Sequence, residues 1–413
     1  MLTSRSCRNI GQRSHLTVKR SQQLAGGERI ATTGKHGAFR THPEGMPATD
    51  VLAFLRDAGS FVDVNRWWRC AYHRLIAQIP SGLCVMWLGI LVIQGSTLLA
   101  NDAVVVKSAS TTRRITGNVI DYTGENILIR HASGREEKIP SENVISIEGD
   151  WKASHQAANT LFAEGSFEAA EAKYREALRD EQRRWVQRRV LSQLTWCYRY
   201  LGQTDQAVKA FLPLYRDDPK TPYFTAIPLT WTTGQVDLDL ERRAASWMQD
   251  EDSSASRLIG ASWSLSSSRR ADAIRVLRKF VSDSDLRIVY LAEAQLWRTQ
   301  VATTQPEEMS HWQERIDRMP SSIRGGPHYV LGLAQSRHAL HDKATISFMR
   351  TAILYSFERD LVPDSLLAAA RELETMDRTT EATSLYREIL TKYETHRVAA
   401  EAESRLNRLA SER

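Results

Sequence analysis

The stretch Trp151–Arg184 places small and large apolar side chains at fixed offsets. Ala158 and Ala170 stand 12 residues apart, with Gly165 between them. This spacing predicts two antiparallel helices that touch at the alanines, because only small side chains let two backbones approach closely. Gly165 can adopt a positive φ and is expected to open the turn. The larger side chains expected around the contact are Leu161, Phe167, Tyr174 and Leu178.

This pattern resembles the tetratricopeptide repeat, a helical hairpin of about 34 residues. One hairpin cannot bury its own apolar faces, so further hairpins are expected to follow it. The resemblance implies a mainly α fold, a solenoid of stacked helical hairpins. It also implies a concave groove of the kind that such repeats use to hold peptides.

A second repeat is predicted from about Arg188, so that the first block of repeats covers residues 151–221. Pro219 is expected to end its second helix, because proline cannot continue the helix. Ala170 and Ala207 are 37 residues apart, about three more than the repeat period. The excess is placed at Arg183–Gln187, between the repeats, where an insertion costs little.

The same pattern returns in residues 327–413. The 12-residue step between small residues occurs there twice, from Gly332 to Ala344 and from Ala370 to Ala382. The last predicted helix, His396–Leu409, alternates alanine with charged residues, as expected of a helix that caps a repeat array.

Residues 222–326 are helical in a different pattern. Pro219–Asp239 is predicted to be a loop or spacer. Two Ala-containing helices follow, with Ala261 and Ala292 31 residues apart, each preceded by an acidic, serine-rich turn. They are similar to HEAT-type repeats, so the array of helices is expected to continue through the middle of the chain.

Residues 101–150 form short alternating segments typical of β-strands, separated by turns such as Thr123-Gly124 and Ser133-Gly134. The expected strands are Val104–Val106, Ile115–Tyr122, Ile127–Ile129, Glu137–Ile139 and Val144–Ile147. Five strands in so short a stretch resemble a small SH3-like or Sm-like barrel. The alternative is a small sheet that packs on the first helices.

Charge is unevenly distributed along the 413 residues. Residues 1–74 hold 12 Lys and Arg against 5 Asp and Glu, whereas the remaining residues hold 43 against 44. The body of the protein is therefore electrically balanced, and we expect no nucleic-acid partner. Residues 1–74 are predicted to be a disordered basic tail, unless translation starts further in.

The interval from Arg74 to Asp102 contains no charged residue, and Leu83–Ala100 is an apolar run of 18 residues. Positive charges precede it, so residues 75–100 are predicted to be a signal peptide, cleaved after Ala100, or a transmembrane anchor. Either places everything after residue 100 outside the cytoplasm, in the bacterial cell envelope. A buried core helix is the alternative.

No motif for an enzyme, a nucleotide or a metal is found, so we expect no catalytic residue, cofactor or small-molecule substrate. Cys197 is the one cysteine in the folded body, and a buried, unreactive thiol is expected. His338, His341 and Asp342 lie close together in sequence. We expect them to belong to an exposed turn and not to a metal site.

The repeat register gives the candidate binding residues. The resemblance implies that two residues of the first helix and three of the third point into the peptide groove: Asn159, Phe162, Trp196, Arg199 and Tyr200. Packing against the next repeat is the alternative for each. The Lys and Asn set with which some relatives hold a terminal carboxylate is not reproduced, because His155 stands at one of its positions.

The sequence therefore predicts a non-catalytic scaffold of the bacterial cell envelope that binds protein or peptide partners. The alternative is an accessory or sensor component of an envelope enzyme system, or an enzyme with an unrecognised site.

Overall fold

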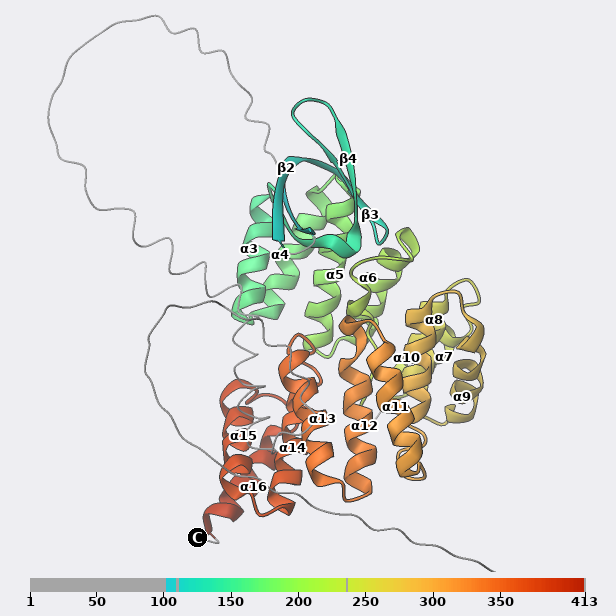
Figure 1. The fold of residues 1–413 in the computed structure, drawn as a ribbon, viewed down its shortest axis with the longest axis vertical. Helices are drawn as coiled ribbons and strands as arrows, with labels where there is room; N and C mark the ends of the chain where they lie inside the picture. The colour runs from blue at the N-terminus through green and yellow to red at the C-terminus, as the bar shows by residue number, and fades with distance from the viewer. Residues whose placement is uncertain (1–101, 109–110, 235–236, 412–413) are drawn as a thin grey trace, which may run out of the picture. The chain divides into compact units, whose positions relative to one another are not determined.

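The computed structural model describes residues 102–108, 111–234 and 237–411. In this part the protein is mainly α: 14 α-helices, packed in consecutive pairs, follow a five-stranded antiparallel β domain (Figure 1). The predicted fold class is confirmed here. The predicted tail at 1–74 and the hydrophobic segment at 75–100 lie outside the described residues. Within them, no helix is both long and apolar enough to cross a membrane.

The β domain contains all five predicted strands, each somewhat longer than expected. They pair in the order β4-β3-β2-β1-β5. The long strand β2 pairs with β1 along its first half and with β3 from Asn118 on, with a register shift in the second pairing between Val119 and Asp121. A 3-10 turn, η1 (Ser141–Asn143), leads into β5. The strand bounds are β1 Asp102–Ser108, β2 Thr111–Tyr122, β3 Asn126–Arg130, β4 Glu136–Pro140 and β5 Val144–Glu148.

The first four helices form the two predicted hairpins. Ala158, Ala170 and Ala207 are completely buried at the crossings, and Gly165 has the expected positive φ of 83°. The small residues thus lie where the sequence pattern placed them. The helix bounds are α3 Ala153–Glu164, α4 Phe167–Asp180, α5 Arg184–Tyr200 and α6 Thr204–Asp217.

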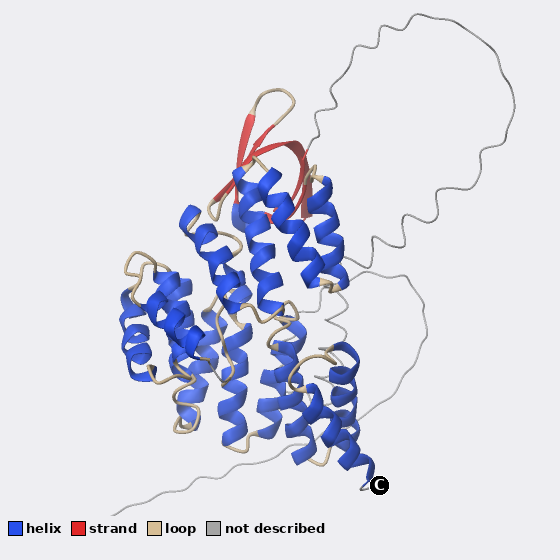
Figure 2. Cartoon of the chain, turned by 180° about the vertical axis from the view of Figure 1, so that it is seen from behind, coloured by secondary structure: helices blue, strands red, loops and turns tan. Residues whose placement is uncertain are grey.

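The β domain packs on these helices and shares a core with them (Figure 2). Trp185 at the start of α5 is buried, and its Nε1 donates a hydrogen bond to the carbonyl of Val119 at 3.1 Å. One turn later, Arg188 donates to the carbonyl of Tyr122 at 2.9 Å and pairs with Asp217 on α6 at 2.6 Å. Strand β2 is therefore fixed to α5.

The predicted position of the extra residues between the first two repeats was wrong. Arg183–Gln187 was expected to be a connection, but α5 already begins at Arg184 and runs for 17 residues. The additional turn is stable because it buries Trp185 against the β domain. The insertion lengthens a helix and does not lengthen a loop.

The middle of the chain is helical, as predicted. Ala261 and Ala292 are both buried in the core. At Gly260 the helices α7 and α8 cross so closely that an added Cβ would lie 2.5 Å from the carbonyl oxygen of Ala244. The helix bounds are α7 Leu238–Met248, α8 Ser254–Ser264, α9 Arg270–Lys279, α10 Leu286–Trp297 and α11 Pro306–Arg318, with the 3-10 turns η3 Phe280–Ser282 and η4 Ser321–Ile323.

The residues Thr221–Thr232, called here the connecting segment, join α6 to α7 and contain a single 3-10 turn, η2 (Phe224–Ala226). This stretch was predicted as a loop or spacer, and it has little regular structure, yet its apolar side chains are buried. Its backbone is bonded by side chains of α8 and α10: Thr230 O accepts from Ser262 Oγ and Gln295 Nε2, both at 3.1 Å. The segment is therefore part of the core.

The C-terminal helices repeat the first pattern. Gly332, Ala344, Ala370 and Ala382 all lie buried at helix crossings. A Cβ at Gly332 would lie 2.7 Å from the Phe348 ring, so this crossing requires glycine. The helix bounds are α12 Gly325–Arg337, α13 His341–Leu354, α14 Val362–Thr375, α15 Thr379–Lys392 and α16 Ala399–Ser411.

Replacing Ala170 by leucine tests the crossing of α3 and α4. Because the alanine is completely buried, the larger side chain should overpack the contact and lower the free energy of unfolding by about 1–3 kcal/mol. Ala169→Leu is the matched control, because the neighbouring alanine is exposed on the same helix. Denaturant unfolding of both variants is the measurement, and equal stabilities would contradict the assigned crossing.

Candidate functional site

The five predicted groove residues lie on two neighbouring helices, with Asn159 and Phe162 on α3 and the other three on α5. The rings of Phe162 and Tyr200 are 5.9 Å apart, and those of Trp196 and Tyr200 are 5.6 Å apart. The structure therefore brings the aromatic members of the set together. Of the five predicted groove residues, four are partly exposed and Arg199 is buried.

Two further aromatic residues extend this surface. Phe167, at the start of α4, lies 4.7 Å from the Tyr200 ring, and Phe357, in the loop between α13 and α14, lies 5.7 Å from the Trp196 ring. Phe357 is 38% exposed, which is high for a phenylalanine. We call these five aromatic residues the aromatic strip: Phe162, Phe167, Trp196, Tyr200 and Phe357.

Arg199 faces the interior. Its guanidinium forms a two-pronged pair with Asp360, with the shortest contact at 2.9 Å, and donates to the carbonyls of Thr225 and Ile227 at 3.4 Å. It also stacks on the ring of Trp196 at 4.2 Å. Arg199 therefore joins α5, the connecting segment and the α13–α14 loop.

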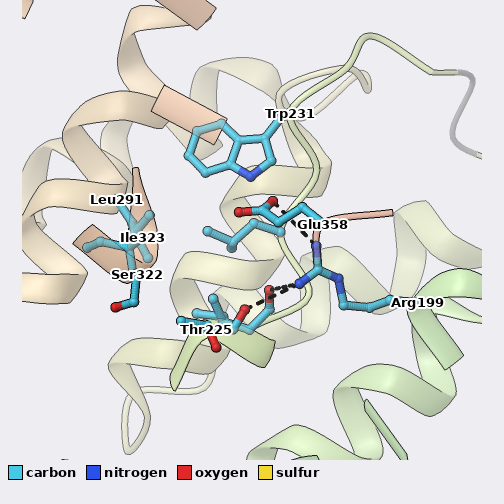
Figure 3. A pocket seen from close by; sticks show the side chains of 9 residues that line it. Arg199, Thr225, Trp231, Leu291, Ser322, Ile323 and Glu358 are labelled. Atoms are coloured by element: carbon cyan, nitrogen blue, oxygen red, sulfur yellow. Dashed lines mark hydrogen bonds and ion pairs between the residues drawn. The ribbon is translucent and has the colours of Figure 1, made fainter. Parts of the chain in front are cut away.

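A small cavity of about 20 Å³ lies beside this arginine (Figure 3). Arg199 and Glu358 point toward each other across it, and Trp231 lies over the carboxyl group. The volume is enough for a single water molecule. The remaining lining residues are Thr225, Ile227, Leu229, Leu291, Ser322 and Ile323.

Glu358 is a buried acid whose ion pair with Arg199 is long, at 3.8 Å. Burial raises its pKa to about 7, although the positive charge of Arg199 acts in the opposite direction. The hydrogen bonds of this arginine go to Asp360 and to the carbonyls of Thr225 and Ile227, and none goes to Glu358. The negative charge of Asp360 raises the pKa further.

The other end of the α3 face is polar. Asn159 accepts a hydrogen bond from the hydroxyl of Tyr174 at 2.7 Å. One turn earlier, His155 is buried and packs on the ring of Trp151 at 4.8 Å. Burial lowers the pKa of His155 to about 4, with the positive charge of Arg189 contributing, so the imidazole is neutral at pH 7.

The other chemical candidates have ordinary surroundings. His341 is paired with Glu372 at 2.6 Å, and within the described ranges no three His, Cys, Asp or Glu side chains are arranged to hold a metal ion. Cys197 is buried, as predicted, and burial raises the pKa of its thiol to about 12. Such a thiol is a poor nucleophile.

A larger open pocket, of about 360 Å³, lies beside α10 and α11. The stacked rings of Trp297 and Trp312, 5.0 Å apart, belong to its lining. Both rings are almost completely buried and Arg315 is already paired with Glu293, so little of this lining is free to bind a ligand.

Sequence reasoning missed the α13–α14 loop. Phe357, Glu358 and Asp360 complete the surroundings of Arg199 from about 160 residues further along the chain. The sequence indicated only weakly that this loop belongs to the site, because it shows only two acidic residues and an aromatic residue between two helices. No protein-family model matches the chain, and no relative was found among curated proteins. The site is therefore interpreted from its own geometry.

The Glu358→Gln variant tests the buried acid. A carboxyl group with a raised pKa in the folded state favours folding when protonated, so wild-type stability should fall as the pH rises from about 4.5 to about 7. In the variant this pH dependence should be absent. The free energy of unfolding of the variant, minus that of wild type, should therefore rise by on the order of 3 kcal/mol between pH 4 and pH 8. Denaturant unfolding at both values is the measurement, and parallel pH profiles would contradict the assignment.

Arg199→Met tests the junction itself. Removing the guanidinium takes away the donors to the Asp360 carboxylate and to the carbonyl of Thr225, whereas the carbonyl of Ile227 still accepts from the backbone N–H of Leu229. The expected cost is about 3–5 kcal/mol in the free energy of unfolding. Arg184→Met on the same helix removes an exposed ion pair with Asp217 and should cost no more than about 1 kcal/mol. Similar losses in both variants would show that the buried network contributes little.

Proposed function

We propose that this chain is a non-catalytic scaffold of the bacterial cell envelope, built from tetratricopeptide-type helical hairpins behind an SH3-like β module. It binds protein or peptide partners through the exposed face of α3 and α5. The observation that carries the proposal is the aromatic strip, which is continuous across α3, α4, α5 and the α13–α14 loop and is partly open to solvent.

The assignment of the helical hairpins as tetratricopeptide-type repeats is supported by where the small residues lie. The 12-residue step between buried Ala or Gly residues occurs at α3–α4, at α12–α13 and at α14–α15. A large aromatic residue follows the second small residue by four positions in each pair: Tyr174, Phe348 and Tyr386. All three are almost completely buried.

The SH3-like assignment is supported by the strand order. The long β2 is shared between two sets of partners, and a 3-10 turn precedes the last strand, which returns to pair with β1. A five-stranded module of this kind closes most of its edges by curling the sheet. No function of its own is proposed for it beyond packing on α5.

The aromatic strip suits a protein or peptide partner. Tyrosine, tryptophan and phenylalanine are enriched at the centres of protein interfaces, where they bury much area with little loss of side-chain freedom. Phe357 is the most exposed of the five and is expected to be an anchor. Arg359 lies 5.4 Å from the ring of Phe167 and adds a positive charge at the edge of the strip.

The envelope location is proposed from the apolar run Leu83–Ala100 and the arginines before it. A reporter fused after residue 110 tests it. Alkaline phosphatase activity at this position is expected, because that enzyme becomes active only outside the cytoplasm. Activity of a cytoplasmic reporter at the same position would contradict the location.

Photo-crosslinking tests the binding face. A photoreactive amino acid at Phe162, introduced into the full chain in cells, should give one dominant adduct with a protein partner, because this residue lies in the partly exposed strip. The same group at Ala169, exposed on α4, is the matched control and should not give that adduct. Identical adducts from both positions, or turnover of a cell-wall substrate by the purified chain, would contradict the proposal.

Phe357→Ser separates binding from folding. Because this ring is 38% exposed, the substitution should weaken the adduct formed from position 162 while costing less than about 1 kcal/mol of stability. The readouts are adduct yield and thermal unfolding. A variant that unfolds like Arg199→Met would show that the ring serves packing alone.

A further inference from the structure

The α13–α14 loop turns two neighbouring residues to opposite sides. Phe357 is 38% exposed and contacts Trp196 in the aromatic strip. Glu358 is 7% exposed and lines the small interior cavity (Figure 3). The loop is short, because α13 ends at Leu354 and α14 begins at Val362. A movement that takes Glu358 out of the interior must therefore move Phe357 as well.

Two carboxyl groups of this loop face one guanidinium. Asp360 is hydrogen-bonded to Arg199, with the shortest contact at 2.9 Å. Glu358 stands 3.8 Å from the same guanidinium, and within the described ranges no group donates a hydrogen bond to its carboxyl oxygens. One positive charge thus meets two acids. Glu358 can leave without exposing an unpaired arginine, because Asp360 still compensates the charge of Arg199.

Uncharged groups complete the surroundings of Glu358. The start of α12 touches it, since a Cβ added at Gly325 would lie 2.7 Å from its Oε1. The phenols of Tyr200 and Tyr355 are titratable neighbours, but burial raises the pKa of each, so both are neutral at pH 7. The connecting segment, α10 and η4 add only uncharged side chains to the cavity wall. Arg199 and Asp360 are therefore the charges that act on this acid.

This position accommodates a protonated Glu358 better than an ionised one. The cavity of about 20 Å³ admits a single water molecule, whereas a carboxylate removed from water needs a close counterion or several hydrogen bonds. Burial accordingly raises the pKa of Glu358 from 4.5 to about 7. A raised pKa means that the closed loop is favoured while the group is protonated, and that this preference falls as the pH rises from about 4.5 to about 7.

We propose that the α13–α14 loop is a pH-dependent switch of the binding face: it holds Phe357 on the aromatic strip while Glu358 is protonated, and it releases both residues toward solvent when the carboxyl group ionises. This inference rests on the proposed function, because it describes how the aromatic strip is regulated. Partner binding is accordingly tighter at pH 6 than at pH 8. The pair of Arg199 with Asp360 persists in both states.

Hydrogen exchange of the full chain at pH 6 and at pH 8, followed by mass spectrometry, tests the switch. The amides of Glu358 and Leu361 report loop opening, because they are bonded within the loop, to Tyr355 O at 2.9 Å and to Glu358 O at 2.8 Å. The wild-type rate is divided by the rate of Glu358→Gln at the same pH, which cancels the chemical pH dependence of exchange. This ratio should rise about tenfold from pH 6 to pH 8, since the pKa of Glu358 is about 4.5 in the open loop and about 7 in the closed one.

Two controls isolate Glu358. Burial also raises the pKa of Asp364 on α14 to about 6, but this residue is present in both proteins, so its titration cancels in the ratio. Glu394→Gln, an exposed position in the loop between α15 and α16, should keep the wild-type pH response. If Glu358→Gln does not fold, the exposed turn at Ser133-Gly134 of wild type supplies the reference rate, and the same rise is expected. A ratio that stays constant between the two pH values overturns the switch.

Crosslinking connects the switch to binding. With the photoreactive group at position 162, the adduct yield in the isolated envelope fraction should fall from pH 6 to pH 8 in wild type and stay constant in Glu358→Gln. A pH-dependent loop together with a constant yield in wild type would also overturn the proposal, because the loop would not control the face.

The two proposals fail separately. An adduct of constant yield and a loop whose exchange ratio does not change would remove the switch and leave the binding face. A loop that opens with rising pH in a chain that gives no adduct at either pH would remove the scaffold function and leave the switch.

Discussion

The buried guanidinium of Arg199 holds together three parts of the chain that are distant in sequence. A charge taken out of water is stable only when its donors are satisfied, and here the acceptors come from the connecting segment and from the loop that carries Asp360. This pairing fixes the α13–α14 loop against α5. As a result Phe357 comes to lie on Trp196, and the loop completes the aromatic strip.

The connecting segment plays a similar role without regular structure. Its buried backbone cannot reach water, so side chains of neighbouring helices bond it: Ser262 and Gln295 at Thr230, and Trp263 at Pro228. Trp231 lies directly on Gly326 of α12, where any side chain would collide with the indole. A stretch that lacks helix and strand signals is thus among the best-anchored parts of the described protein.

Local patterns made most of the fold predictable. The Ala158–Ala170 step needs only residues within one hairpin, and the same holds for the Ser133-Gly134 turn between two strands, where Gly134 has a φ of 82°. The prediction was wrong at Arg183–Gln187, because the extra turn of α5 is stabilised by Trp185 against the β domain, a contact with residues far earlier in the chain. Long-range packing of this kind leaves no periodic signal.

In the candidate site, too, local patterns were predictable and long-range contacts were not. Helical register placed Phe162, Trp196 and Tyr200 on one face, and the structure brings their rings together. Register could not reveal that Arg199 faces inward, because its partners Thr225 and Asp360 lie in loops.

In this account, the connecting segment and the Arg199 pairing form a rigid joint that keeps the α3 and α5 face in one shape for a partner. Hydrogen exchange of the full chain, followed by mass spectrometry, tests this joint most directly. The amides of Thr221–Thr232 should exchange as slowly as those in the middle of α5. Exchange as fast as in the exposed turn at Ser133-Gly134 would contradict it.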